Sequence, residues 1–185
     1  MATAKTPAEA WVDAALPVLA AGGPDAVRVE QLANGLGVTK GGFYWHFPDR
    51  AAFLQRVLDR WEQLAVENVI EQLESHPGAA RDKLRELFDI AFAFAVADEG
   101  QRAELAIRDW ARRDPAVEAR LRGVDERRMA YLRDLFAQIC DDPLDTEARA
   151  LTAYSLFVGQ HFLATGHDGH TRHEVLRAAL EGLLR

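Results

Sequence analysis

The stretch RVEQLANGLGVTKGGFYWHFPDR, residues 28–50, decides the architecture of the N-terminal part of this chain. Its first half predicts a short amphipathic helix, because apolar residues recur at helical spacing: Val29, Leu32, Ala33 and Leu36. Gly37 is expected to end that helix, since glycine reaches left-handed backbone angles without steric cost. Thr39 then stands where a hydroxyl side chain caps a second helix.

The second helix is expected to turn Phe43 and Phe47 inward and to leave a mixed, glycine-containing face outward. Two short helices joined by a tight glycine-containing turn form the helix-turn-helix unit, which places its second helix in the major groove of DNA. The stretch therefore predicts a DNA-binding regulator. The candidate DNA contacts on this helix are Thr39, Lys40, Gly41, Gly42, Tyr44, Trp45 and His46.

The chemistry of these side chains suits a duplex. The hydroxyls of Thr39 and Tyr44, with the first amides of the helix, match phosphate oxygens. Lys40 could donate to guanine O6 or N7, or to a phosphate. The two glycines would allow the backbone to approach the groove closely. A purely structural helix pair, in which the aromatic residues serve local packing, is the alternative.

The rest of the chain also reads as helical, with no alternating pattern that would indicate a strand. Helices are expected over 8–21, 50–73, 80–97, 101–112, 114–140, 143–164 and 172–184. Asp49 is the expected N-cap of the second of these, and Thr171 with Glu174 forms a capping box for the last. Pro17 is expected to kink the first helix. The prediction is an all-α fold of about nine helices.

Composition narrows the class of protein only slightly. The 185 residues carry a net charge of −7. Residues 1–60 hold six Lys or Arg and six Asp or Glu, a net of 0, so charge alone would not indicate nucleic-acid binding. Cys140 is the single cysteine, expected to be a small buried hydrophobe rather than a redox group. No apolar run is long enough for a membrane span and no signal peptide is evident, so a cytoplasmic protein is expected.

Residues 11–54 resemble the TetR family of transcriptional regulators. The helix AWVDAALPVLAAGG leads into VEQLANGLGV, which is followed by TKGGFYWHF and then by PDRAAFL, in that order and spacing. The resemblance implies a homodimer that binds a palindromic double-stranded DNA operator and releases it when a small-molecule effector enters the C-terminal domain. It places the DNA-binding domain at 1–50 and the ligand-binding and dimerisation domain at 51–185.

The chain departs from the family pattern at two charged positions. Arg28 precedes the first motif helix where Ser or Thr is usual, and Arg50 opens the following helix where Lys is usual. Both could reach a phosphate, so both join the candidate DNA contacts. The glycine pair Gly41-Gly42 is a further peculiarity, because each glycine costs roughly 1 kcal/mol of helix propensity relative to alanine.

The resemblance also suggests where an effector would bind. Aromatic and polar residues lie on helices that such a fold gathers around a central cavity: Trp61, Phe88, Phe92, Trp110, Arg128, Tyr131, Phe157 and His161. For the aromatic members, plain core packing is the alternative. Arg128 falls within an apolar series of its helix, so it is expected to pair with a buried acid, to reach solvent or to meet an anionic ligand.

The last two helices are the candidates for a two-fold interface, because no later element of the chain would cover the leucine-rich face of the final helix. The expected interface residues are Leu151, Ser155, Val175, Leu176, Ala179, Leu180 and Leu183.

Other functions find less support. The repeated spacing of His167, His170 and His173 beside Asp168 could supply imidazole ligands, but a solvated turn is the expectation, so no metal or other cofactor is predicted. No nucleophile and base stand together in a recognisable motif, and no enzyme activity is predicted. The alternatives are a helical small-molecule-binding protein or enzyme without DNA binding, which the electroneutral head would fit, and a dimerising scaffold.

Overall fold

The computed structural model describes residues 6–96 and 99–185, with side chains described except at 92–96 and 99–101. Every regular element in these ranges is a helix, as predicted: α1 (Ala8–Ala26), α2 (Val29–Gly35), α3 (Lys40–Tyr44), α4 (Arg50–Glu62), the π-helical segment η1 (Gln63–Glu67), α5 (Asn68–Glu74), α6 (Ala80–Val96), α7 (Glu99–Ala111), α8 (Pro115–Phe136), α9 (Pro143–Gly159) and α10 (Arg172–Leu183). Because α4, η1 and α5 follow one another without a break, the described chain has nine helices. No helix in these ranges has both the length and the apolar character of a bilayer-spanning segment.

The chain divides into two compact units, which are described separately. The first comprises Met1–Ala65 and Ala97–Leu121, and the second comprises Val66–Val96 and Arg122–Arg185. Of the three divisions, one falls within η1, one directly after α6 and one within α8. The expected functional division at residue 50 stays a prediction, because compact packing does not by itself assign function.

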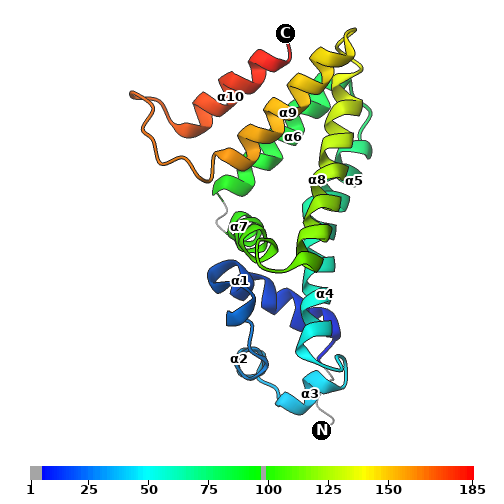
Figure 1. Cartoon of the computed structure of the whole chain (residues 1–185), viewed down its shortest axis with the longest axis vertical. Coiled ribbons are helices and arrows are strands. Elements are labelled where there is room, and N and C mark those ends of the chain that lie inside the picture. Colours follow the sequence, from blue (N-terminus) through cyan, green and yellow to red (C-terminus); the bar gives the residue numbers. More distant parts are fainter. Residues whose placement is uncertain (1–5, 97–98) are drawn as a thin grey trace. The chain divides into compact units, whose positions relative to one another are not determined.

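The first unit is built around an aromatic core. Phe43 is fully buried, and its ring centroid lies 5.5 Å from that of Trp11 and 5.1 Å from that of Phe53. Phe47 completes the cluster at 5.1 Å from Phe43. The inward placement of both motif phenylalanines is thus confirmed. In the same unit α1 packs along α7 and against α4 (Figure 1).

Helix α1 is longer than expected and is interrupted at a different residue. It continues to Ala26, and the non-helical angles within it occur at Gly23, with φ 69° and ψ −172°. The expected kink at Pro17 is not marked by non-helical angles. The fixed φ of proline is compatible with a helix, and its lack of one amide hydrogen does not force the backbone out of helical angles there, whereas Gly23 adopts a conformation that other residues rarely reach.

The second unit packs the parts of α6, α8, α9 and α10 that lie within it around one apolar cluster, and α10 lies alongside α6 and α9 (Figure 1). Leu180 and Leu184 are 2% and 4% exposed in this cluster. The earlier helices α6 and α9 cover part of the leucine-rich face of the last helix, so the interface expected on the rest of this face stays a prediction. Two ion pairs also join α10 to α6: Arg85 with Glu181 at 2.8 Å, and Arg177 with Asp89 at 2.6 Å.

The start signals at Asp49 and Thr171 are confirmed, whereas several helix ends were misplaced. Asp49 accepts a hydrogen bond from the amide of Ala52 at 2.8 Å, and the Thr171–Glu174 capping box is present. The π-helical segment inside the long helix was not predicted. Helices α8 and α9 end four to five residues before the predicted ends at about 140 and 164. Beyond these ends the backbone forms turns with i→i−3 bonds, such as those from Ile139 to Phe136 and from Phe162 to Gly159.

Candidate nucleic-acid interface

Helices α2 and α3 meet through the turn that the sequence predicts. Gly37 has φ 67°, the left-handed conformation expected of it. The amide of Val38 donates to the carbonyl of Ala33 at 2.9 Å, which closes the end of α2. The apolar face of α2 is buried through Val29, Leu32 and Ala33. The result is two short helices on a common apolar base with one outward surface.

That outward surface is rich in exposed aromatic and small residues. Tyr44 is 53% exposed and Trp45 is 77% exposed, although both follow directly on the buried Phe43. Lys40 and Gly41 are exposed, and Gly42 is half-buried. Large apolar surfaces left in water indicate an interaction surface rather than a folding requirement.

Thr39 occupies the expected N-cap position of α3 with an extended backbone, but its side chain makes no capping hydrogen bond. The expected hydroxyl cap is therefore wrong. The turn is closed through the backbone instead, where the amide of Gly42 donates to the carbonyl of Thr39 at 2.9 Å. The exposed hydroxyl of Thr39 therefore takes no part in capping α3.

Lys40 forms an ion pair with Glu30, ten residues earlier on α2, and both side chains are largely exposed. Hydrogen bonding to Lys40 lowers the pKa of the Glu30 carboxyl, and hydrogen bonding to Glu30 raises the pKa of the Lys40 ammonium. The positive charge of Arg28 acts on the same carboxyl in the same direction. The sequence did not indicate this pair, because the two residues belong to different helices and their register depends on the turn.

His46 and Arg50 bond to the backbone of the first unit. Nε2 of His46 lies 2.8 Å from the carbonyl oxygen of Thr6. The guanidinium of Arg50 donates to the carbonyl of Val27 at 2.9 Å and also to that of Pro24. Arg50 thus joins the start of α4 to the end of α1, a supporting position that local sequence patterns do not reveal.

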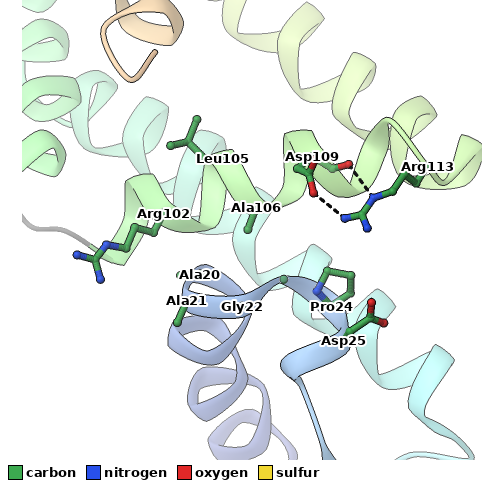
Figure 2. A pocket seen from close by; sticks show the side chains of 11 residues that line it. Ala20, Ala21, Gly22, Pro24, Asp25, Arg102, Leu105, Ala106, Asp109 and Arg113 are labelled. Atoms are coloured by element: carbon green, nitrogen blue, oxygen red, sulfur yellow. Dashed lines mark hydrogen bonds and ion pairs between the residues drawn. The ribbon is translucent and has the colours of Figure 1, made fainter. Parts of the chain in front are cut away.

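An open cleft of about 390 Å³ lies in the first unit between the C-terminal part of α1 and α7 with the turn after it (Figure 2). Residues 20–25 form one wall, and Arg102, Leu105, Asp109 and Arg113 belong to the other. Arg113 donates to the carboxylate of Asp109 at 2.6 Å. None of the predicted effector residues lines this cleft. The sequence did not indicate it, since it depends on the break at Gly23 and the packing of α7.

The predicted effector residues are distributed over both units. Trp61 and Trp110 belong to the first unit. The second unit contains Phe88, Arg128, Tyr131, Phe157 and His161. The side chain of Phe92 lies outside the described residues.

Within the second unit, Arg128 belongs to a polar and aromatic cluster. Its guanidinium lies 5.3 Å from the ring centroid of Phe157 and donates to the hydroxyl of Tyr154 at 3.3 Å. That hydroxyl in turn donates to Asp125 at 2.6 Å. Burial raises the pKa of the Tyr154 phenol to about 12. The ring of His161 stands edge-on to Phe157 at 6.0 Å. Tyr154 was missed because one tyrosine in a helical pattern gives no signal of such a role.

Tyr131 takes part in a different contact. Its hydroxyl donates to Glu74 at 2.7 Å, and burial together with that bond raises the pKa of the phenol. Phe88, only 8% exposed, is part of the apolar core of the second unit. Neither contact joins these two residues to the Arg128 cluster.

The predicted interface residues differ in their accessibility. Leu151 is 55% exposed, Val175 is 36% exposed, and Ser155 and Ala179 are also exposed. Leu176 and Leu183 are half-buried against the apolar core, and Leu180 is buried inside it. Among the residues that the structure describes, no group of three or more His, Cys, Asp or Glu is placed to hold an ion.

Comparison with known proteins identifies the motif. Residues 12–57 match the family model described as "Bacterial regulatory proteins, tetR family". The regulator AcrR of Shigella flexneri is 27% identical over 96 residues, which is 52% of this chain and 45% of that protein. The regulator TtgW of Pseudomonas putida is 42% identical over 57 residues, covering 31% of this chain and 42% of that protein. The chain spans less than half the length of these curated relatives.

Solved structures share the fold across the whole chain. A transcriptional regulator from Saccharomonospora viridis in complex with choline has a TM-score of 0.78 at 19% identity, covering 96% of this chain and 94% of that one. The structure of AibR in complex with isovaleryl coenzyme A and operator DNA has a TM-score of 0.70 at 15% identity, covering 96% and 97%. The helix-turn-helix segment of this chain, residues 12–57, thus matches the TetR family of bacterial regulatory proteins, and the described chain shares the fold of these solved structures.

Proposed function

We propose that this protein is a transcriptional regulator that binds an operator through α3 and releases it in response to a small molecule. The observation that carries the proposal is the α2–turn–α3 unit, in which a buried Phe43 supports an exposed face of Thr39, Lys40 and Tyr44. This unit lies inside the segment that matches the family model. Repression is the expected effect, since a bound regulator would compete with other proteins for the same DNA.

On this proposal the motif residues divide into contacts and supports. Thr39, Tyr44 and Trp45 would bond to or pack on the phosphate and sugar backbone, and Lys40 would donate to a base or a phosphate. Gly41 would let the backbone approach the groove, because open space surrounds a side chain built there except for the Thr39 hydroxyl at 3.7 Å. Arg50 and His46 would act mainly by holding α1 and the preceding arm in place.

We further propose a homodimer on a palindromic operator. The exposed residues Leu151 and Ser155 of α9 with Val175 and Ala179 of α10 are the proposed interface, because apolar side chains on helices of the second unit remain accessible. An isologous two-fold interface would present two copies of α3 to successive major grooves, about 34–36 Å apart.

For the effector, the Arg128 cluster and the neighbouring aromatic residues of the second unit are the proposed recognition groups. Solved relatives of the same fold hold choline or isovaleryl coenzyme A, so the fold accommodates ligands of different chemistry. A ligand would release DNA only by binding the DNA-incompetent state more tightly than the competent one.

A mobility-shift titration against the DNA upstream of the protein's own gene tests this proposal. We expect a discrete complex that weakens as salt increases, and a footprint with two-fold symmetry. Absence of any complex at low salt, with turnover of a small molecule by the same preparation, would favour a helical enzyme without DNA binding.

A further inference from the structure

The ion pair between Lys40 and Glu30 lies on the proposed DNA-binding face. Lys40 is the first residue of α3 and Glu30 lies in the first turn of α2. The side chains are 49% and 61% exposed, so neither is held in place by burial. In the free protein the Glu30 carboxylate thus binds the Lys40 ammonium group, to which a DNA phosphate would otherwise bind.

Few other cations of this region are available to DNA. Among the described residues between 6 and 60, Arg50 bonds to backbone carbonyls, Arg56 pairs with Asp59 at 3.4 Å and Arg60 pairs with Asp13 at 2.9 Å. The remaining cation, Arg28, interacts electrostatically with the Glu30 carboxylate, as Lys40 also does. One carboxylate thus pairs directly with Lys40 and also attracts the charge of Arg28.

We propose that Glu30 competes with DNA phosphates for Lys40 and thereby sets the sequence-independent part of the DNA affinity. Each complex in which Lys40 meets a phosphate must either separate this pair or bring the Glu30 carboxylate close to a polyanion. Sequence-independent binding consists almost entirely of such charge contacts. Glu30 therefore acts as a restraint on binding to unrelated DNA. This inference rests on the proposed DNA-binding function.

The region that contains this pair, residues 1–60, has no net charge. Residues 1–60 balance six cations against six anions, so loss of one anion at the binding face changes the local charge appreciably. Glu9 offers a matched control, since it is an exposed acid of α1 in the same unit and is not a candidate DNA contact. Glu9→Gln makes the same change in net charge as Glu30→Gln.

The test is a fluorescence-anisotropy titration of a labelled duplex of scrambled sequence at several salt concentrations. We expect Glu30→Gln to tighten binding about 3- to 10-fold at low salt and to steepen the slope of log K against log salt by about 0.9, the value for one added phosphate contact. Glu9→Gln should change both quantities much less. In a Lys40→Ala background, Glu30→Gln should lose most of its effect.

The outcomes separate this inference from the proposed function. If the unaltered protein binds DNA but Glu30→Gln behaves like Glu9→Gln, or has the same effect without Lys40, then the competition is wrong and the proposed function stands. If neither the unaltered protein nor any variant binds DNA at the lowest salt, both are overturned. Circular dichroism of each variant would establish that the helices are intact.

Discussion

The two units of this protein stabilise their helices in different ways. In the first, the short helix α3 packs on α1 and α4 through a ring cluster around Phe43, and α2 buries Val29, Leu32 and Ala33 beside it. In the second, longer helices share an aliphatic core and are joined at its edge by ion pairs such as Arg85–Glu181. Helices as short as α2 and α3 are not stable alone, so the proposed DNA-binding surface depends on a small aromatic cluster centred on Phe43, whereas the second unit distributes its stability over a larger core.

Removal of that aromatic residue should have the largest effect. Phe43→Ala leaves a cavity in the ring cluster and should lower the free energy of unfolding by about 3–5 kcal/mol. Phe136→Ala is the matched change in the second unit, where the side chain is also fully buried. Denaturant titration with amide exchange should show α2 and α3 exposed selectively by Phe43→Ala. Equal exposure of α3 by both variants would contradict the comparison.

The polar cluster of the second unit should contribute less. Tyr154→Phe removes the hydrogen bond to Asp125 and should lower the free energy of unfolding by about 1.5 kcal/mol. Because the folded pKa of Tyr154 is raised to about 12, its neutral form contributes fully below the unfolded pKa of about 10. That contribution is lost as the pH rises from about 10 to about 12.

Ultraviolet absorbance of the phenolates would measure the ionisation of Tyr154. Denaturant titrations at pH 9 and pH 11 would measure the loss of stability that accompanies it. The unaltered protein should lose more stability between the two pH values than Tyr154→Phe does. If the absorbance difference between the unaltered protein and Tyr154→Phe showed that Tyr154 ionises near pH 10 in the folded protein, the expectation would lose its physical basis.

Substitution of a glycine in α3 should change the stability of the free protein and its DNA affinity in opposite directions. Gly41→Ala meets no close atom and should stabilise the free protein by about 0.5–1 kcal/mol through helix propensity, while its methyl group weakens DNA binding by crowding the groove. Thermal unfolding and anisotropy on the same preparation would record both. Tighter DNA binding by this variant would show that close backbone approach is not needed.

The ion pairs between α6 and α10 should have the smallest effect. The Arg85 and Glu181 side chains are about half exposed, and exposed pairs contribute only about 0–1 kcal/mol. A double-mutant cycle with Arg85→Gln and Glu181→Gln would isolate the coupling. A coupling above about 2 kcal/mol would mean that the second unit also depends on a single contact.

The sequence predicted several features that local rules determine, although the Pro17 kink and the Thr39 cap, expected from rules of the same kind, were wrong. Gly37, the Asp49 cap and the Thr171 capping box each depend on residues within one turn, and the inward placement of Phe43 follows from helical spacing. Features that depend on distant residues were not predictable: the bonds of Arg50 to the end of α1, and the cover that α6 and α9 give to the leucines of α10. The Lys40–Glu30 pair belongs to the same class, since the turn sets its register.

The most direct test of the proposed function is the DNA affinity of the double variant Lys40→Ala, Tyr44→Ala on the DNA upstream of the protein's own gene. Both side chains are largely exposed on α3, so their removal should leave the fold intact while binding falls by at least tenfold and its salt dependence becomes shallower. Unchanged affinity in a folded double variant would contradict the assignment of α3 as the DNA-reading helix.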